Sequence, residues 1–153
     1  MRIRGFEEVK EKFKFHKGVP THLPIRADVR SAGYDFFSKE TVEIKPNEQH
    51  AFYTDVKAYM LPNEVLYIFP RSSYGIKKGL MLSNTTGVID SSYYGNFAND
   101  GNIIIVLKNV SHETVTIEKG DRIAQGVFMQ YLTTDDDLSI SLERRGGIGS
   151  SGN

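Results

Sequence analysis

The fold is decided by the stretch Ile103-Ile104-Ile105-Val106-Leu107, which is followed by the alternating segment Thr114-Val115-Thr116-Ile117-Glu118 and the turn Lys119-Gly120-Asp121. β-Branched residues favour strands, and glycine beside aspartate favours a turn. A further β-forming segment, residues 123–129, follows that turn, and Val65-Leu66-Tyr67-Ile68-Phe69 has the same character upstream. Short strands separated by turn residues in this way predict an all-β domain, either a sandwich or a barrel.

Length and composition are those of one globular domain. The chain has 153 residues, of which 39% are hydrophobic and 25% charged, and this is enough to bury a core. Nineteen basic and nineteen acidic residues give a net charge of zero, which argues against a general nucleic-acid binder. The sequence has no cysteine, so a disulfide, a thiol nucleophile and a cysteine-ligated zinc site are excluded.

No segment of the sequence has the character of a membrane span or a signal peptide. Apolar runs stay far below the roughly 20 residues that cross a bilayer, and residues 1–8 lack an apolar core. We therefore expect a cytoplasmic protein, either in its own cell or in an infected host cell.

Two short stretches predict helix. Residues 6–15 are charged and loosely amphipathic, and residues 74–78 follow Arg71-Ser72-Ser73, whose hydroxyl groups are suited to cap a helix.

The end of the chain differs in composition from the rest. We divide the sequence into a β domain, residues 1–132, and a C-terminal arm, residues 133–153, whose last ten residues contain four glycines. From the residues alone, this end is either a disordered tail or an anion-binding segment, in which glycines let backbone N–H groups approach an anion and arginines supply charge.

Five short motifs occur in a fixed order along the chain. They are Ser31-Ala32-Gly33-Tyr34-Asp35, Pro70-Arg71-Ser72-Ser73, the segment 87–95 that looks like a hairpin returning from residues 80–84, Arg122-Ile123-Ala124-Gln125, and the glycine-rich end. Together they resemble the trimeric dUTP pyrophosphatase (dUTPase) family, from about Leu23 onward.

That resemblance implies a single-domain distorted jelly roll or β-barrel of the β-clip type, with a flexible C-terminal arm. It implies hydrolysis of dUTP to dUMP and pyrophosphate by attack of water at the α-phosphate, which limits uracil incorporation into DNA and supplies dUMP for dTMP synthesis. It also implies a homotrimer whose active sites are shared between subunits.

The segment Gly87-Val88-Ile89-Asp90 is the expected chemical centre. An ionised carboxylate at a turn is suited to orient and deprotonate water, and the resemblance gives this role to Asp90. The alternative is a turn-forming aspartate before Ser91. The resemblance also puts the Tyr93 ring under the sugar, where it leaves no room for a 2′-hydroxyl group; a core or edge-strand tyrosine is the alternative.

Uracil recognition is expected in the hairpin that contains Asn84, Gly87 and Ile89. Uracil offers two carbonyl acceptors and one N–H donor, which backbone groups of an open hairpin can match. Cytosine would leave a donor facing a donor, at a cost of about 1–3 kcal/mol for an unsatisfied buried group. Asn84 is the side chain expected to contribute.

Phosphate binding is expected at three motifs. The resemblance implies that Arg71, Ser72 and Ser73 hold the α- and β-phosphates and that Gln125 donates to the phosphate chain. Asp35 would organise water bound to Mg²⁺, which the triphosphate itself would mainly hold. The alternative for Arg71 is a surface ion pair.

The resemblance makes the glycine-rich end a lid over the nucleotide. Arg145, with Arg144 as the second choice, would reach the γ-phosphate, with Gly149 and Ser150 also in contact with the nucleotide. The family usually has phenylalanine stacked on uracil where this chain has Ile148, so we expect weaker closure.

Two other functions fit the same scaffold. A dCTP deaminase needs a glutamate in the strand after the hairpin, where this chain has Lys108, so this alternative is disfavoured. A nucleotide-sensing regulator with a protein partner is the second, more naturally as an added role. The long start before Leu23 and the apparent insertion at residues 96–102 are departures from the family that could affect trimer contacts or outside partners.

Overall fold

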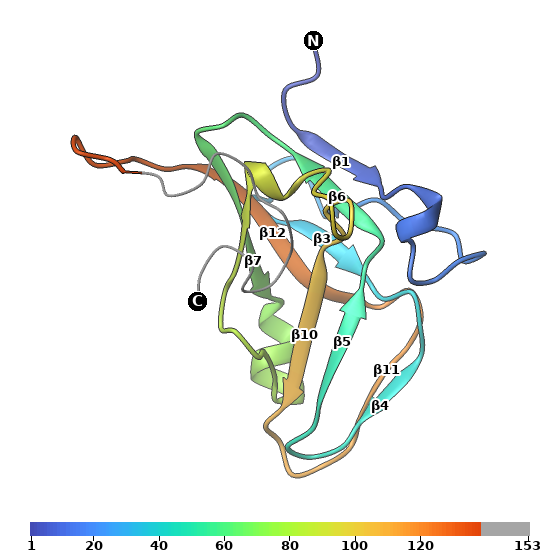
Figure 1. Cartoon of the computed structure of the whole chain (residues 1–153). Helices are drawn as coiled ribbons and strands as arrows, with labels where there is room; N and C mark the ends of the chain where they lie inside the picture. Colours follow the sequence, from blue (N-terminus) through green and yellow to red (C-terminus); the bar gives the residue numbers. More distant parts are fainter. Residues whose placement is uncertain (139–153) are drawn as a thin grey trace.

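The computed structural model describes residues 1–138, and these form twelve β-strands and three short helical segments (Figure 1). The largest sheet has five antiparallel strands in the order β2 (Ile25–Arg26), β3 (Tyr34–Phe37), β12 (Arg122–Gln130), β7 (Glu64–Pro70) and β9 (Gly87–Asp90). The predicted all-β class is therefore confirmed.

A second sheet of three strands packs with the first. Its order is β5 (Gln49–Tyr53), β10 (Ile104–Asn109) and β8 (Leu80–Leu82). Two further ribbons pair β1 (Gly5–Glu8) with β6 (Val56–Tyr59) and β4 (Val42–Ile44) with β11 (Val115–Ile117). In Figure 1 the β10–β5 pair lies in front of the β12–β7–β3 sheet, and the β4–β11 ribbon extends from one end.

One hydrophobic core joins the two sheets. Phe36 and Leu66 of the five-stranded sheet belong to the same buried cluster as Phe52, Ile105 and Leu107 of the three-stranded sheet. The predicted strands around residues 65–69, 103–107, 114–118 and 123–129 are all confirmed as β7, β10, β11 and β12. Their β-branched and aromatic residues fill this interior, which is why the local pattern was sufficient to find them.

The two helix predictions had different outcomes. A five-residue π-helix, η2 (Tyr74–Lys78), is confirmed after Arg71, although no side chain caps it. The helix predicted over residues 6–15 is wrong: this segment forms strand β1 and only one 3-10 turn, η1 (Glu11–Phe13). Pairing of β1 with the distant strand β6 satisfies its backbone, and this non-local contact overrides a weak local preference.

The chain leaves the body of the domain after β12. Tyr131 still donates hydrogen bonds from its backbone N–H to the Asn63 carbonyl (3.1 Å) and from its hydroxyl group to the Pro62 carbonyl (2.7 Å). Residues 132–138 are exposed and project away from the sheets (Figure 1). The predicted boundary at residue 132 stays a prediction. Within residues 1–138, no helix is long and apolar enough to cross a membrane.

Candidate active site

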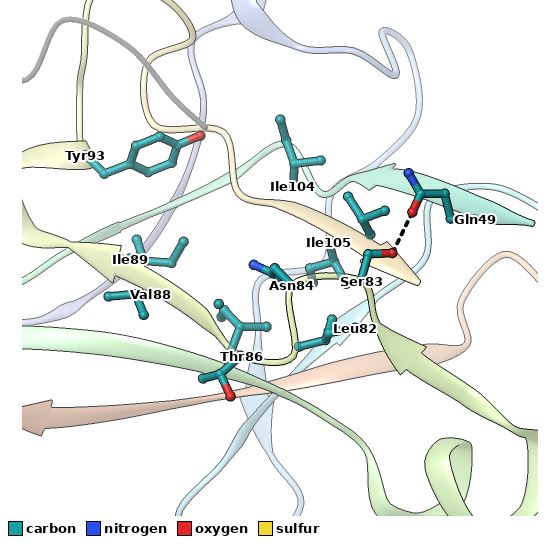
Figure 2. A pocket seen from close by; sticks show the side chains of 13 residues that line it. Gln49, Leu82, Ser83, Asn84, Thr86, Val88, Ile89, Tyr93, Ile104 and Ile105 are labelled. Carbon is teal, nitrogen blue, oxygen red and sulfur yellow. Dashed lines mark hydrogen bonds between the residues drawn. The ribbon is translucent and has the colours of Figure 1, made fainter. Parts of the chain in front are cut away.

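A pocket of about 530 Å³ opens between the two sheets (Figure 2). This volume is in the range of sites for small organic ligands. Strands β9 and β10 form most of its wall together with the end of β8 and the loop that follows it, and Gln49 of β5, Ile68 of β7 and Tyr93 complete it. Figure 2 shows Tyr93 at one end and Gln49 at the other, where Ser83 Oγ donates a 2.9 Å hydrogen bond to Gln49 Oε1.

The pocket exists because the two arms of the predicted hairpin separate. The segments are present, but β8 pairs with β10 and β9 pairs with β7, so each is an edge strand of a different sheet. The loop between them turns at Thr85, whose φ of 64° lies in the left-handed region. A splayed hairpin exposes backbone N–H and C=O groups to a ligand, which a closed ladder would not do.

Three of the expected uracil-binding residues line this pocket. Asn84 lies on the exposed loop, Ile89 is half-buried on β9, and Gly87 is buried between them. A Cβ atom at Gly87 would lie 2.8 Å from Ile68 Cβ. The strand can thus approach β7 closely only with glycine at this position.

Asp90 and Tyr93 follow directly along the chain. Asp90 is half-buried at the end of β9, next to Ile89, and is followed by the 3-10 turn η3 (Ser91–Tyr93). The Tyr93 side chain is 7% exposed and lines the pocket. Its hydroxyl group donates to the Asn102 carbonyl at 2.6 Å and accepts from Asn99 Nδ2 at 2.8 Å. The ring is therefore held at a fixed position beside the cavity.

A charged cluster lies at the other end of β7. Asp35 is buried and faces two guanidinium groups, with Oδ1 3.5 Å from Arg71 Nε and Oδ2 3.3 Å from Arg122 Nη1. Arg71 thus pairs with a buried carboxylate in this structure, and its expected phosphate-binding role stays a prediction. Arg122 lies in the motif Arg122-Ile123-Ala124-Gln125, and its place next to Asp35 follows from the pairing of β12 with β3.

Gln125 and the two serines lie close to this cluster. Gln125 is the register partner of Asp35 on one side and of Phe69 on the other. Its Nε2 donates to the Pro70 carbonyl at 3.4 Å. Ser72 is exposed and Ser73 half-buried, both at the start of the η2 helix. The expected phosphate-binding residues therefore lie near one another, around the C-terminal end of β7.

Strand β7 separates this cluster from Asp90. Asp90 is the register partner of Val65 near the start of β7, whereas Arg71 follows Pro70 at its end. From Val65 to Arg71 the chain advances six residues (71 − 65). At about 3.3 Å per residue, the two positions lie roughly 20 Å apart in one chain.

The remaining predicted residues lie outside the described part of the chain. These are Arg145, Ile148, Gly149 and Ser150, with Arg144 as the second choice for the arginine. Within residues 1–138, no group of three or more histidine, cysteine, aspartate or glutamate side chains could hold a metal ion.

Comparison with known proteins identifies the family. The dUTPase family profile matches residues 20–152. The deoxyuridine 5′-triphosphate nucleotidohydrolase of Lactococcus lactis subsp. lactis (strain IL1403) is 46% identical over 153 residues, which cover 99% of both chains. The chain belongs to the dUTPase family.

Solved dUTPase structures have the same fold. The crystal structure of dUTPase from Streptococcus mutans matches with a TM-score of 0.73 and 43% identity, covering 86% of this chain and 98% of that one. The dUTPase of Staphylococcus bacteriophage 80alpha matches with a TM-score of 0.70 and 25% identity, covering 92% and 97%. The dUTPase-type distorted β-barrel is therefore the architecture of this chain. Lys108, which stands where a dCTP deaminase needs a glutamate, is an exposed residue of β10 and pairs with Met81.

Proposed function

We propose that this dUTPase hydrolyses dUTP to dUMP and pyrophosphate, with Mg²⁺, at a site that the pocket of one chain forms with the charged cluster of a neighbouring chain in a homotrimer. Hydrolysis of dUTP is supported by family membership and by the close relative from Lactococcus lactis. The residue roles and the shared site rest on the geometry described above.

The observation that carries the shared site is that Asp90 of β9 lies beside the start of β7, whereas Arg71 follows the end of β7. The α-phosphate must lie beside the group that activates water, and the β-phosphate is its direct neighbour. A separation of roughly 20 Å along one strand is too large for one short triphosphate to contact both groups. A second copy, related by rotational symmetry, can present its Arg71 next to this chain's Asp90, and closed symmetric rings are the common form of homo-oligomers.

The pocket is suited to uracil and deoxyribose. Its walls are mainly isoleucine, leucine and valine side chains, and the edges of β8 and β9 add backbone donors and acceptors. These match the two carbonyl groups and one N–H of uracil, with the Asn84 amide group as a further partner. The buried Tyr93 ring then bounds the space at the sugar and excludes a 2′-hydroxyl group by shape.

Asp90 is suited to act as the general base. It lies between the pocket residue Ile89 and the turn that carries Tyr93, and thus at the sugar-phosphate end of a bound nucleotide. Its carboxylate accepts a proton from water as the water oxygen attacks the α-phosphorus. The bond from the α-phosphorus to the bridging oxygen breaks, and its electron pair leaves with pyrophosphate.

The charged cluster is suited to the phosphate chain and its metal. Arg71 and Gln125 offer N–H donors to phosphate oxygens, and the hydroxyl groups of Ser72 and Ser73 lie beside them. When phosphate arrives, Arg71 can exchange the Asp35 carboxylate for a phosphate, which frees one Asp35 oxygen.

The donor set fits a metal that enters with the substrate. The described residues build no metal cage, and Asp35 is the carboxylate of the phosphate-binding cluster. Its oxygen would hold metal-bound water, in keeping with the preference of Mg²⁺ for oxygen ligands and retained waters. The chemistry that Mg²⁺ supplies when bound is to offset phosphate charge and fix the triphosphate conformation.

The glycine-rich end is proposed to close over the nucleotide. Arg145 would neutralise the γ-phosphate, Gly149 and Ser150 would approach the phosphates, and Ile148 would cover the uracil face without stacking. Excluding other water from the site strengthens the charge interactions within it.

A four-substrate assay tests the proposed function. The protein and Mg²⁺ are incubated separately with dUTP, dCTP, dTTP and UTP, and pyrophosphate and the nucleotide product are identified. We expect dUMP and pyrophosphate from dUTP and little turnover of the other three. Release of ammonia from dCTP, or equal turnover of UTP and dUTP, would contradict the assignment.

A further inference from the structure

We propose that the N-terminal segment, residues 5–16, is a positioning element for Tyr93 and thereby sets how strictly the enzyme distinguishes deoxyribose from ribose. The inference rests on the proposed sugar-selecting role of Tyr93. It links two parts of the sequence that lie far apart, the long start before Leu23 and residues 96–102, through contacts that the fold makes.

Tyr93 is held at both ends by residues 96–102. Its hydroxyl group donates to the Asn102 carbonyl (2.6 Å) and accepts from Asn99 Nδ2 (2.8 Å). Its backbone carbonyl accepts from Asn96 Nδ2 (2.8 Å) and from the Asn96 backbone N–H (3.2 Å). A shift of this loop therefore moves the ring that bounds the pocket.

Asp100 fixes the loop to the N-terminal segment. Its carboxylate is 2% exposed and accepts hydrogen bonds from the Lys10 backbone N–H and from Lys57 Nζ, each at 2.8 Å. The backbone is tight here as well, because a Cβ atom at Gly101 would lie 2.9 Å from the Tyr93 carbonyl oxygen. The loop thus packs directly on the turn that carries Tyr93.

Asn102 makes a second connection through Asp55. Asn102 Nδ2 donates to Asp55 Oδ1 at 2.9 Å, and the Asp55 backbone N–H donates to Asn102 Oδ1 at 2.9 Å. The fully buried Asp55 carboxylate also accepts from the backbone N–H groups of Phe15 (2.8 Å) and His16 (3.0 Å), and it pairs with Lys39 Nζ at 2.9 Å. The N-terminal segment therefore supplies donors to both buried carboxylates.

Tyr94 provides a third connection, on the residue next to Tyr93. Its hydroxyl group donates to Glu7 Oε2 of β1 at 2.7 Å, and Lys57 Nζ lies 4.9 Å from the centre of its ring. Lys57 thus contacts both Asp100 and Tyr94. This network connects the turn η3 and the loop 96–102 to the N-terminal segment at several points.

The inference is tested by the ratio of kcat/KM for dUTP to that for UTP. Tyr94→Phe keeps the ring and removes only the hydroxyl bond to Glu7, and Asp100→Asn weakens the bonds to Lys10 and Lys57. We expect the ratio to fall roughly tenfold in Asp100→Asn and severalfold in Tyr94→Phe, a size typical of steric discrimination in a pocket. The kcat for dUTP should stay within about twofold of wild type, since the charged cluster is untouched.

Lys14→Ala is the matched control. Lys14 lies in the same segment but pairs only with Glu8 and Glu11 among the described residues, and its loss should leave the ratio unchanged. A folded Tyr94→Phe and a folded Asp100→Asn with the wild-type ratio would overturn the inference, even if both were less heat-stable. Tyr93→Ala separates the two claims: an unchanged ratio in that variant would refute the sugar role of Tyr93 itself, whereas a lowered ratio there alone would refute only the positioning role.

Discussion

The two ends of strand β7 carry two different kinds of site. Near Val65 and Ile68, the neighbouring strand β9 contributes Gly87 and Ile89 to a mainly apolar pocket and ends at Asp90. Beyond Pro70, the polar partners are the side chains of Arg71 and Gln125, grouped with Asp35.

The difference between the two ends indicates that they bind different parts of the nucleotide. The apolar end is complete in shape within one chain, because its walls are strands of the core. At the charged end, Arg71 and Arg122 pair with Asp35. This cluster lies too far from the pocket of its own chain to bind the phosphates of a nucleotide held there. We infer that the first end recognises the base and the sugar and that the second holds the phosphates of a nucleotide bound to a neighbour.

The largest effect is expected from Asp90→Asn. Loss of the general base should lower kcat for dUTP by about 10²–10⁴-fold, while KM changes little because the pocket keeps its shape. Steady-state pyrophosphate release measures both constants. Glu43→Gln, which removes an exposed carboxylate from β4, is the control and should behave as wild type. Near-normal turnover by Asp90→Asn would remove Asp90 as the base.

Arg71→Ala should have the next largest effect. Loss of a charged hydrogen-bond donor to phosphate is expected to lower kcat/KM by roughly 10–100-fold, and Arg71→Lys should recover only part of it because lysine lacks the planar fork. Arg122→Ala should lose less, since Arg122 faces Asp35 from the other side. An equal or larger loss in Arg122→Ala would assign the phosphate contact to Arg122 instead.

Gly87→Ala disturbs only the apolar end. The added Cβ atom would lie 2.8 Å from Ile68 Cβ, so overpacking should lower the free energy of unfolding by about 1–3 kcal/mol and raise KM more than it lowers kcat. Chemical denaturation at fixed protein concentration measures the first effect. At Gly75, a Cβ atom would come no closer than 3.8 Å to the Leu80 carbonyl oxygen, so Gly75→Ala is the neutral control.

The smallest effect is expected on the free energy of unfolding when the pH is lowered. Burial alone would raise the pKa of the Asp55 and Asp100 carboxyl groups, but hydrogen bonds from Lys39 and Lys57 and from N-terminal backbone N–H groups outweigh it and hold each pKa below its usual range. Their stabilisation is complete above about pH 4, the unfolded value, and is lost as pH falls through the lower folded values. Unfolding titrations between neutral and acid pH should show this loss, with a shallower acid dependence in Asp100→Asn than in wild type. An identical dependence in the two proteins would contradict this reading.

The sequence was sufficient for several of the strands but not for how the strands combine. Strand β7 was predictable because Val65 to Phe69 carries its own β-forming pattern and stops at proline. The splayed arms of the expected hairpin were not, because the choice of β10 and β7 as partners depends on contacts across the whole chain. The same reason explains the error at residues 6–15, where Phe6 is buried through pairing of β1 with β6.

The site residues were predictable as a group through the family motifs. Their arrangement was not, because the register Asp35–Gln125–Phe69 and the distance from Asp90 to Arg71 are properties of the folded sheet. Arg122 was also missed, since an arginine in a motif shows its partner only once β12 lies against β3.

A mixing experiment tests the shared site most directly. Asp90→Asn and Arg71→Ala proteins, each with its activity measured alone, are unfolded, mixed in equal amounts and refolded together. If one chain's Asp90 works with a neighbour's Arg71, random assembly restores both groups in about a quarter of the sites, and activity should rise toward that fraction of wild type. If both groups acted within one chain, every site would lack one of them, and activity that stays at the level of the separate variants would contradict the account.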